Sequence, residues 1–158
     1  MRKRFALMCF LCCLFIGNTA SADVTGFVGA NQTPSTRTVR GLALSFSLFF
    51  VGLEFEFSDT QENLKENAPG LRTGMFNLEF QSPQITRLVF YGTLGGGIYQ
   101  ERLSEHRTTN FGSNLGGGVK IPLGGPLGLR IDHRIFLLQG TPLIKRPQRT
   151  YLGLNLEV

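Results

Sequence analysis

The chain has 158 residues, 42% of them hydrophobic, and a formal net charge of +5. Its length suits one domain. Three positive charges lie within the first four residues, and without residues 1–22 the balance falls to 13 Lys and Arg against 11 Asp and Glu. A net charge of +2 leaves too small a basic excess for binding to a phosphate backbone, which argues against nucleic acid as a partner.

Residues 1–22 have the features of an export signal. A basic start precedes an apolar run of 12 residues and the small residues Ala20, Ser21 and Ala22, the order typical of a cleavable signal peptide. The apolar run is shorter than the roughly 20 residues of a membrane-spanning helix. We therefore expect cleavage before Asp23 and a mature domain of residues 23–158. All three cysteines precede this point, so the mature domain is expected to fold without disulfides.

From residue 24 onward, apolar and polar residues alternate with period two, the pattern of β-strands with two different faces. For example, Leu115 and Val119 share one face, whereas Asn114 and Lys120 share the other. No segment shows comparable helical spacing. The predicted strands cover residues 24–31, 39–48, 51–58, 72–81, 87–99, 108–121, 127–137 and 149–158.

The connections between these strands alternate in length. Long polar connections are expected at residues 32–38, 59–71, 100–107 and 138–148. The intervening connections are short, and two of them contain the Pro and Gly residues typical of turns. The third, near Phe49 and Phe50, lacks such residues. The long loops are therefore expected to lie together at one end of an antiparallel sheet.

The charged residues distinguish a membrane barrel from a soluble one. Five acids and five bases fall on the strand face opposite the apolar residues, and a small membrane barrel turns such a face inward. An eight-stranded lumen is filled by side chains, so enclosed charges must pair. A soluble lipocalin-like barrel would have to enclose the charged face or expose the apolar one. The predicted lumen charge network comprises Glu54, Glu56, Glu79, Lys120, Arg130, Asp132, Arg134 and Glu157, together with Arg87 and Arg149.

These features predict an all-β fold, an eight-stranded antiparallel up-and-down transmembrane β-barrel. The chain resembles the small eight-stranded bacterial outer-membrane barrels of the outer-membrane protein A-like kind. Its last strand resembles the C-terminal assembly signal of that family, with Tyr151 and then Gly153 followed by the apolar residues Leu156 and Val158 at alternate positions. Val158 departs from the family pattern, in which the last residue is most often aromatic. The resemblance implies recognition by the barrel-assembly machinery, short periplasmic turns and long surface loops.

Two matching glycine runs, residues 95–97 and 116–118, lie on the fifth and sixth predicted strands. Neither precedes a helix with the spacing of a phosphate-binding loop. Glycine within a strand usually marks a bend or a close approach of two backbones. We interpret both runs in this way, with Gly96 expected opposite Gly117.

Two sets of polar residues invite other functions. Ser104, Glu105 and His106 contain the residue types of a hydrolase triad, but their adjacency is not the geometry of one, and a solvated loop is favoured. His133 falls on the lipid face, without a second metal ligand nearby.

Basic residues in or beside the long loops could contact lipopolysaccharide phosphates, although acids share this region and an ordinary solvated surface is slightly favoured. These basic residues are Arg37, Arg40, Arg72, Arg107, Lys145 and Arg146.

The sequence thus predicts a non-enzymatic integral outer-membrane protein of a Gram-negative-type bacterium. It would contribute to envelope structure or to surface contact through its extracellular loops. Its expected partners are outer-membrane lipid, lipopolysaccharide and the barrel-assembly machinery, and a monomer is expected. No catalytic, cofactor-binding or metal-binding residue is assigned. The alternatives are a barrel enzyme acting on outer-membrane lipid, with Ser104, Glu105 and His106 as its site, and a narrow channel for a small solute.

Overall fold

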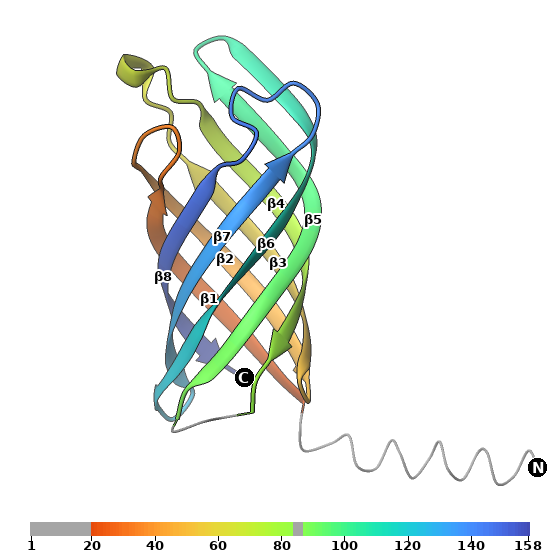
Figure 1. Ribbon diagram of the computed structural model, residues 1–158. Coiled ribbons are helices and arrows are strands. Elements are labelled where there is room, and N and C mark those ends of the chain that lie inside the picture. The colour runs from red at the N-terminus through yellow and green to blue at the C-terminus, as the bar shows by residue number, and fades with distance from the viewer. Residues whose placement is uncertain (1–19, 84–86) are drawn as a thin grey trace, which may run out of the picture.

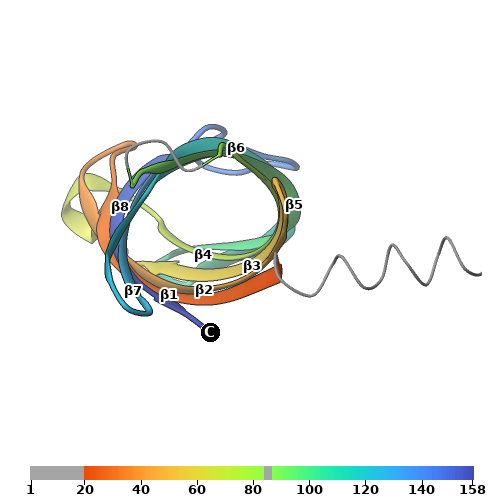
Figure 2. The same cartoon turned by 90° about the horizontal axis from the view of Figure 1, so that it is seen from below.

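The computed structural model describes residues 20–83 and 87–158, so the predicted export signal up to residue 19 lies outside the described residues. Eight antiparallel strands form one closed barrel in which each strand pairs with its neighbours in sequence and β1 pairs with β8 (Figures 1 and 2). The strands are β1 (Ala20–Asn31), β2 (Arg37–Leu48), β3 (Val51–Thr60), β4 (Gly70–Gln81), β5 (Val89–Leu103), β6 (His106–Gly124), β7 (Leu127–Leu138) and β8 (Gln148–Glu157). A short 3₁₀ helix, η2 (Leu64–Glu66), lies between β3 and β4.

The strand register determines how strongly the strands tilt. Following paired residues once around the barrel from Ala20 of β1 leads through Phe80, Gly117 and Thr150 back to β1 at Ala30. The register therefore advances by ten residues in one circuit. With a rise of about 3.3 Å per residue and about 4.8 Å between strands, this shear tilts the strands by about 40°.

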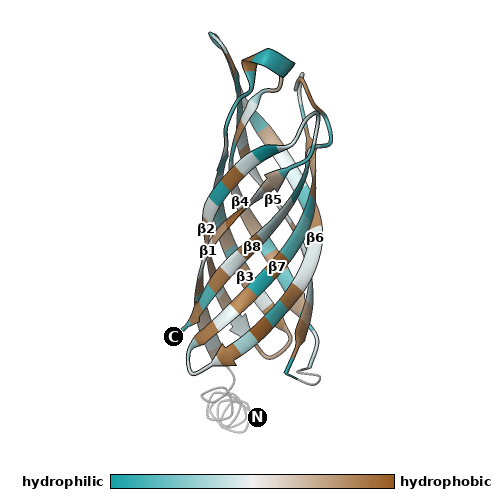
Figure 3. Cartoon of the chain, turned by 90° about the vertical axis from the view of Figure 1, so that its left-hand side faces the viewer, coloured by the Kyte–Doolittle hydropathy of each residue, from teal (hydrophilic) through white to brown (hydrophobic). Residues whose placement is uncertain are grey.

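The alternation of side chains places apolar residues outside the barrel. Phe46, Phe111 and Leu115 are 71%, 68% and 60% exposed, and the other outward positions of the strands are mostly Leu, Ile, Val or Phe. Arg130 and Arg134, by contrast, are 0% exposed on the inner face. Figure 3 shows the resulting alternation of hydrophobic and hydrophilic residues along the strands. This inside-out distribution is the one expected of a membrane barrel.

The predicted strands agree with the observed ones, with differences of up to four residues at their ends. The connection expected at residues 100–107 is a two-residue turn, because β5 and β6 continue to Leu103 and His106 as a paired hairpin. The pairs between Gln100 and Thr109 and between Glu101 and Thr108 extend the ladder through a segment whose polarity suggested a loop. β1 begins at Ala20, three residues before the expected mature terminus.

The connections lie at two different ends of the barrel. The beginning of β1 and the C-terminus share the end that carries the short connections, and the longer loops extend from the other end (Figure 1). The β2–β3 connection is a two-residue turn at Phe49 and Phe50, as the strand predictions require. Phe49 adopts a positive φ of 56°, which is unusual for a bulky residue. No described helix is long and apolar enough to cross a membrane.

Candidate functional site in the barrel lumen

Arg130 of β7 is fully buried in the lumen and contacts three carboxylates. Its Nη1 atom is 2.6 Å from Glu54 Oε2, and its Nη2 atom is 3.1 Å from Glu79 Oε2 and 3.4 Å from Asp132 Oδ2. Its Nε donates a hydrogen bond to the hydroxyl of Tyr91 at 2.7 Å. The carboxylates come from β3, β4 and β7, so this single side chain connects both walls of the barrel.

Arg134, four residues further along β7 on the same inner face, repeats the arrangement. Its guanidinium lies 2.8 Å from Glu54, 3.1 Å from Glu56 and 2.9 Å from Asp132. Glu54 and Asp132 are therefore each shared with Arg130. All five of these side chains are 0% exposed. Buried ions of this kind are tolerated only when they are closely paired, as they are here.

Arg149 of β8 continues the network toward the loop end. Its Nη2 lies 2.6 Å from Glu56 Oε1, and its Nη1 donates to Ser58 Oγ at 2.7 Å. Its guanidinium also lies 4.8 Å from the ring centre of Phe136. Arginine thereby pairs with a carboxylate and an aromatic ring at once, a combination that a planar cation permits.

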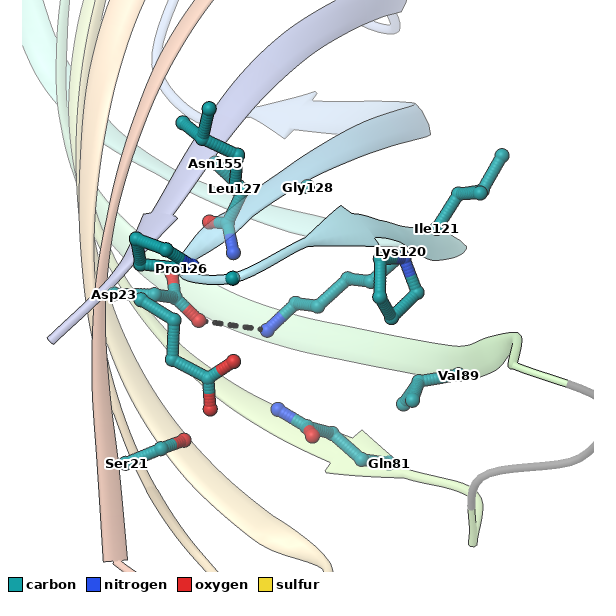
Figure 4. Close-up of a pocket in the computed structure, with 13 residues that line it drawn as sticks. Ser21, Asp23, Gln81, Val89, Lys120, Ile121, Pro126, Leu127, Gly128 and Asn155 are labelled. Atoms are coloured by element: carbon teal, nitrogen blue, oxygen red, sulfur yellow. Dashed lines mark hydrogen bonds and ion pairs between the residues drawn. The ribbon is translucent and has the colours of Figure 1, made fainter.

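Lys120 of β6 continues the network toward the short-turn end. Its Nζ lies 2.7 Å from Glu79 Oε1 and 3.1 Å from Asp23 Oδ2. Figure 4 shows the contact with Asp23 at the mouth of the barrel. Asp23 was not among the predicted lumen charges, because it precedes the first predicted strand, which begins at residue 24. Strand parity would have identified it, since Asp23 shares its face with the buried Thr25 and Phe27 of β1.

Two predicted lumen charges lie elsewhere. Glu157 has the inward parity of β8, but it is exposed at the mouth and forms no ion pair with any described residue. Arg87 was expected at the start of a strand, yet β5 begins only at Val89 and Arg87 is exposed in the preceding turn with a φ of 70°. The other predicted members, and Arg149, all lie in the ion-pair network.

Uncharged polar side chains complete the packing of the lumen. Asn77 donates to Glu54 at 2.8 Å and accepts from Asn114 at 2.7 Å, while Tyr91 donates to Asp132 at 2.5 Å. Parity placed these residues on the inner face, but nothing in the sequence indicated their partners. The central lumen is thus filled by ion-paired and hydrogen-bonded side chains, although Thr93 Oγ1, Asn114 Oδ1 and Tyr151 Oη have no hydrogen-bond partner among the described residues. The described residues contain no group of three or more His, Cys, Asp and Glu side chains that could hold a metal ion.

The glycine runs permit close approach between strands. A Cβ atom at Gly95 or Gly97 would collide with the backbone of β4, and one at Gly116 or Gly118 would collide with the backbone of β7. This agrees with their interpretation. The expected pairing of Gly96 with Gly117 is wrong, because Gly96 lies opposite Ser113. The shift of four residues preserves the faces, which is why parity alone did not reveal it.

The hydrolase-like residues do not form a triad. Ser104 and Glu105 form the exposed turn of the β5–β6 hairpin. The backbone N–H of Ser104 donates to Glu62, and the hydrogen-bond partner of the His106 ring is Thr108 at 3.0 Å. No hydrogen bond between these three residues' side chains is present in the described structure.

His133 lies on the outer face of β7, as predicted, where its Nδ1 is 2.8 Å from Thr150 Oγ1.

The basic residues near the loops have different surroundings. Arg37 is buried and donates to the carbonyl oxygens of Thr33, Ser35 and Pro69, so it fastens two loops together rather than facing a ligand. Arg72 lies 3.1 Å from Asp59. Arg40 on β2, Arg107 on β6, and Lys145 and Arg146 in the β7–β8 loop are all exposed.

The four residues of the proposed assembly signal point in two directions. Tyr151 and Gly153 face the lumen, where the Tyr151 ring stacks on Phe27 at a centroid distance of 4.0 Å. Leu156 and Val158 are exposed outside the barrel. The backbone N–H of Val158 donates to the carbonyl of Ala22 at 2.8 Å, next to the seam between β8 and β1. Half of the motif is therefore also used for packing in the folded barrel.

Comparison with known proteins gives structural rather than sequence matches. No protein-family model and no curated protein matches the sequence. The N-terminal β-barrel domain of Pseudomonas aeruginosa OprF superposes with a TM-score of 0.64 at 13% identity, covering 87% of this chain and 97% of that one. Neisserial surface protein A gives a TM-score of 0.63 at 10% identity, covering 88% and 94%. Ail of Yersinia pestis gives 0.57 at 14% identity, covering 89% and 99%.

These matches span nearly the whole of each compared chain, and they agree with the closed eight-stranded topology and the outward apolar face. At such low identity they support an assignment of fold. The chain has the fold of the small eight-stranded outer-membrane β-barrels.

Proposed function

We propose that this chain is a non-enzymatic integral outer-membrane protein that serves envelope structure or surface contact through its loops. The observation that carries the proposal is that one barrel combines an apolar outer surface with a charged, closed interior. Exposed Phe46, Phe111 and Leu115 would be unfavourable in water and favourable in lipid. The buried ions leave the extracellular loops and the outer surface as the parts available for contact.

Membrane fractionation tests the location. We expect the protein in the outer-membrane fraction, where it should migrate differently on a gel before and after boiling because the closed barrel resists detergent. A wash with high salt or alkali separates integral from peripheral association. Recovery in the soluble periplasmic fraction would refute the proposal.

The outer surface supports lipopolysaccharide as a partner. Arg40, Asp59 and Arg72 are paired in register across β2, β3 and β4, at the loop end of the apolar surface. Grooves of about 360 and 340 Å³ flank Phe57 beside Arg72. Two guanidinium groups above apolar grooves suit a lipid that carries phosphates, since arginine pairs well with phosphate. Asp59 offsets one of these charges.

Binding of lipopolysaccharide to the refolded barrel tests this partner. The Arg40→Gln/Arg72→Gln double variant should bind several-fold more weakly than wild type, because it loses up to two charge-assisted contacts. Arg87→Gln is the matched control, since Arg87 is an exposed arginine in a short turn at the other end. Equal binding by all three proteins would contradict this role and show that these arginines belong to an ordinary solvated surface.

A further inference from the structure

The lumen network has one more carboxylate than it has cations. The ion pairs connect Asp23, Glu79, Glu54, Asp132 and Glu56 in one continuous chain. The cations of the same chain are Lys120, Arg130, Arg134 and Arg149. Five acids against four bases leave a formal charge of −1 among the described residues. An unbalanced buried charge is strongly unfavourable, so a further cation is expected.

The excess negative charge lies at the short-turn mouth. Lys120 is shared between Glu79 and Asp23, and Asp23 Oδ1 has no hydrogen-bond partner among the described residues although Asp23 is only 6% exposed. Glu157 is the β8 partner of Asp23 and adds another carboxylate. Asp23, Lys120 and Glu157 line a pocket of about 110 Å³ (Figure 4).

A cation can arise at this point from the chain itself. Hydrolysis of the bond between Ala22 and Asp23 adds the hydroxyl of water to the Ala22 carbonyl carbon and a proton to the Asp23 nitrogen. At neutral pH that nitrogen takes a second proton from solvent, because a free α-amino group has a pKa of about 7.7–8.0. The neutral backbone amide of Asp23 thereby becomes an α-ammonium group.

We propose that the α-ammonium group of Asp23, created by removal of the export signal, is the missing cation of the lumen network. Directly opposed residues of antiparallel strands have Cα atoms about 4.5–5.5 Å apart, and Glu157 is opposite Asp23. The Asp23 nitrogen is bonded to the Asp23 Cα atom, so the new charge lies within side-chain reach of the carboxylates of Asp23 and Glu157. The inference rests on the proposed function, since the signal is removed only from an exported protein.

Cleavage also has a structural cost that this charge can offset. In the uncleaved chain Ala20, Ser21 and Ala22 pair with β2, and the Ala22 carbonyl accepts a hydrogen bond from Val158 at 2.8 Å. Cleavage removes these contacts and removes Ser21 from the lining of the pocket. Asp23 then becomes the first residue of β1, with its ammonium group at the open mouth.

The experiment compares two chains refolded in detergent. One begins at Asp23, released by a protease that leaves no extra residue, and the other begins at Ala20. In the longer chain the ammonium group is moved by three residues, about 10 Å along an extended strand. Each chain is made as wild type and as Glu157→Gln. Glu105→Gln is the matched control, because Glu105 is an exposed acid in the turn at the opposite end.

We expect Glu157→Gln to increase the unfolding equilibrium constant of the Asp23 chain about fivefold, the upper range for a partly exposed ion pair. The same substitution should leave the Ala20 chain unchanged or slightly more stable, because it removes a repelling carboxylate there. Glu105→Gln should alter neither chain. Mass spectrometry of the protein from outer membranes should show a mature chain that begins at Asp23.

Equal effects of Glu157→Gln in both chains would overturn the inference, as would a native chain that begins elsewhere. Stabilisation of the Asp23 chain by millimolar Mg²⁺ or spermidine, abolished by Glu157→Gln, would show that a soluble cation fills the mouth and would also overturn it. Failure of the proposed function is distinguishable, because neither chain would then fold into a heat-modifiable barrel in detergent.

Discussion

Arg134 shows how one residue can connect distant parts of this chain. Its guanidinium contacts Glu54, Glu56 and Asp132, and two of these carboxylates belong to β3, about 80 positions away in sequence. Each carboxylate was removed from water on folding, a cost that only close pairing repays. The stability of the barrel therefore depends on individual lumen cations far more than on individual surface charges.

Replacing Arg134 with Leu should lower the free energy of unfolding by about 3–5 kcal/mol, because it leaves buried carboxylates without their partner. Urea titration of the refolded protein measures the change. Arg87→Leu, at an exposed turn position, should change the midpoint little. Adding Glu56→Gln to Arg134→Leu should recover part of the loss. An unchanged midpoint for Arg134→Leu would mean that the residue faces water.

The glycine run at residues 95–97 allows the close-approach interpretation to be tested at two adjacent residues. A Cβ atom at Gly95 would meet the backbone of Phe76 and Asn77, whereas at Gly96 the nearest atom would be the Gly112 carbonyl oxygen at 3.4 Å. Gly95→Ala should destabilise the barrel by about 1–3 kcal/mol through overpacking. Gly96→Ala should be nearly neutral. Equal unfolding midpoints for the two variants would contradict the close-approach interpretation.

Among the elements, β5 does more than complete the wall. It extends beyond the apolar surface, and near its end Glu101 accepts hydrogen bonds from the backbone N–H groups of Leu143 at 2.8 Å and Ile144 at 3.4 Å. Glu101 is 3% exposed. The β7–β8 loop is thereby attached to the β5–β6 hairpin, so the hairpin acts as a support for the neighbouring surface loop.

Glu101→Ala should release the β7–β8 loop while the barrel remains folded. Loss of hydrogen bonds to a charged group, worth about 1.5–3 kcal/mol, should raise tryptic cleavage after Lys145 at least tenfold. Glu105→Ala, an exposed acid of the same hairpin, serves as the control. Identical cleavage rates in both variants would show that Glu101 does not hold the loop.

The last strand combines closure of the barrel with the proposed assembly signal. Val158 is 83% exposed, so a larger side chain at this position would not disturb the interior. Val158→Phe should therefore speed assembly of the barrel in cells, because it restores the aromatic terminus typical of the resembled family, while leaving the unfolding midpoint unchanged. Pulse-chase measurement of the heat-modifiable form checks this. Slower assembly than wild type, or no difference from Val158→Ala, would count against the signal.

At the scale of the whole molecule, the barrel encloses a plug made of its own side chains. Arg130 and Arg134 pair with carboxylates across the lumen and are 0% exposed. The described cavity at the mouth is small, about 110 Å³. An eight-stranded barrel leaves an interior just wide enough for its side chains. These observations favour an anchor or a contact protein over a conduit.

Planar-bilayer recording is expected to show no steady conductance for the refolded protein. The charged side chains occupy the path, and moving an ion past them requires breaking buried pairs. Arg130→Ala combined with Glu54→Ala removes a central pair and should produce intermittent current. A stable conductance for the wild-type protein at moderate voltage would support the channel alternative instead.

The sequence predicted the strands accurately because alternation is a local property. The alternation of apolar and polar residues with period two indicates which side of a strand contacts lipid. This inference requires neither the register nor the identity of the partner strand. The same reasoning placed Glu54, Glu79 and Arg130 on the inner face. It failed near residues 100–107, where polarity suggested a loop although the hairpin continues beyond the apolar surface.

Pairing could not be derived in this way. Parity is preserved when a register shifts by two or four residues, so Gly96 was placed opposite Gly117 rather than Ser113. The partners of each lumen charge also depend on the shear of the closed barrel, which accumulates over all eight strand pairs. Parity alone places Asp23 on the inner face, but its contact with Lys120 of β6 depends on the same shear.

The sequence alone therefore determined the class of fold, the number of strands and the residues that face inward, because each depends on alternation along a single strand. The tertiary structure decided which charges meet, that Glu157 remains exposed at the mouth, and that Asp23 belongs to the network. Those outcomes depend on closure of the barrel, since Coulomb interactions in a buried interior depend on the distance between side chains contributed by different strands.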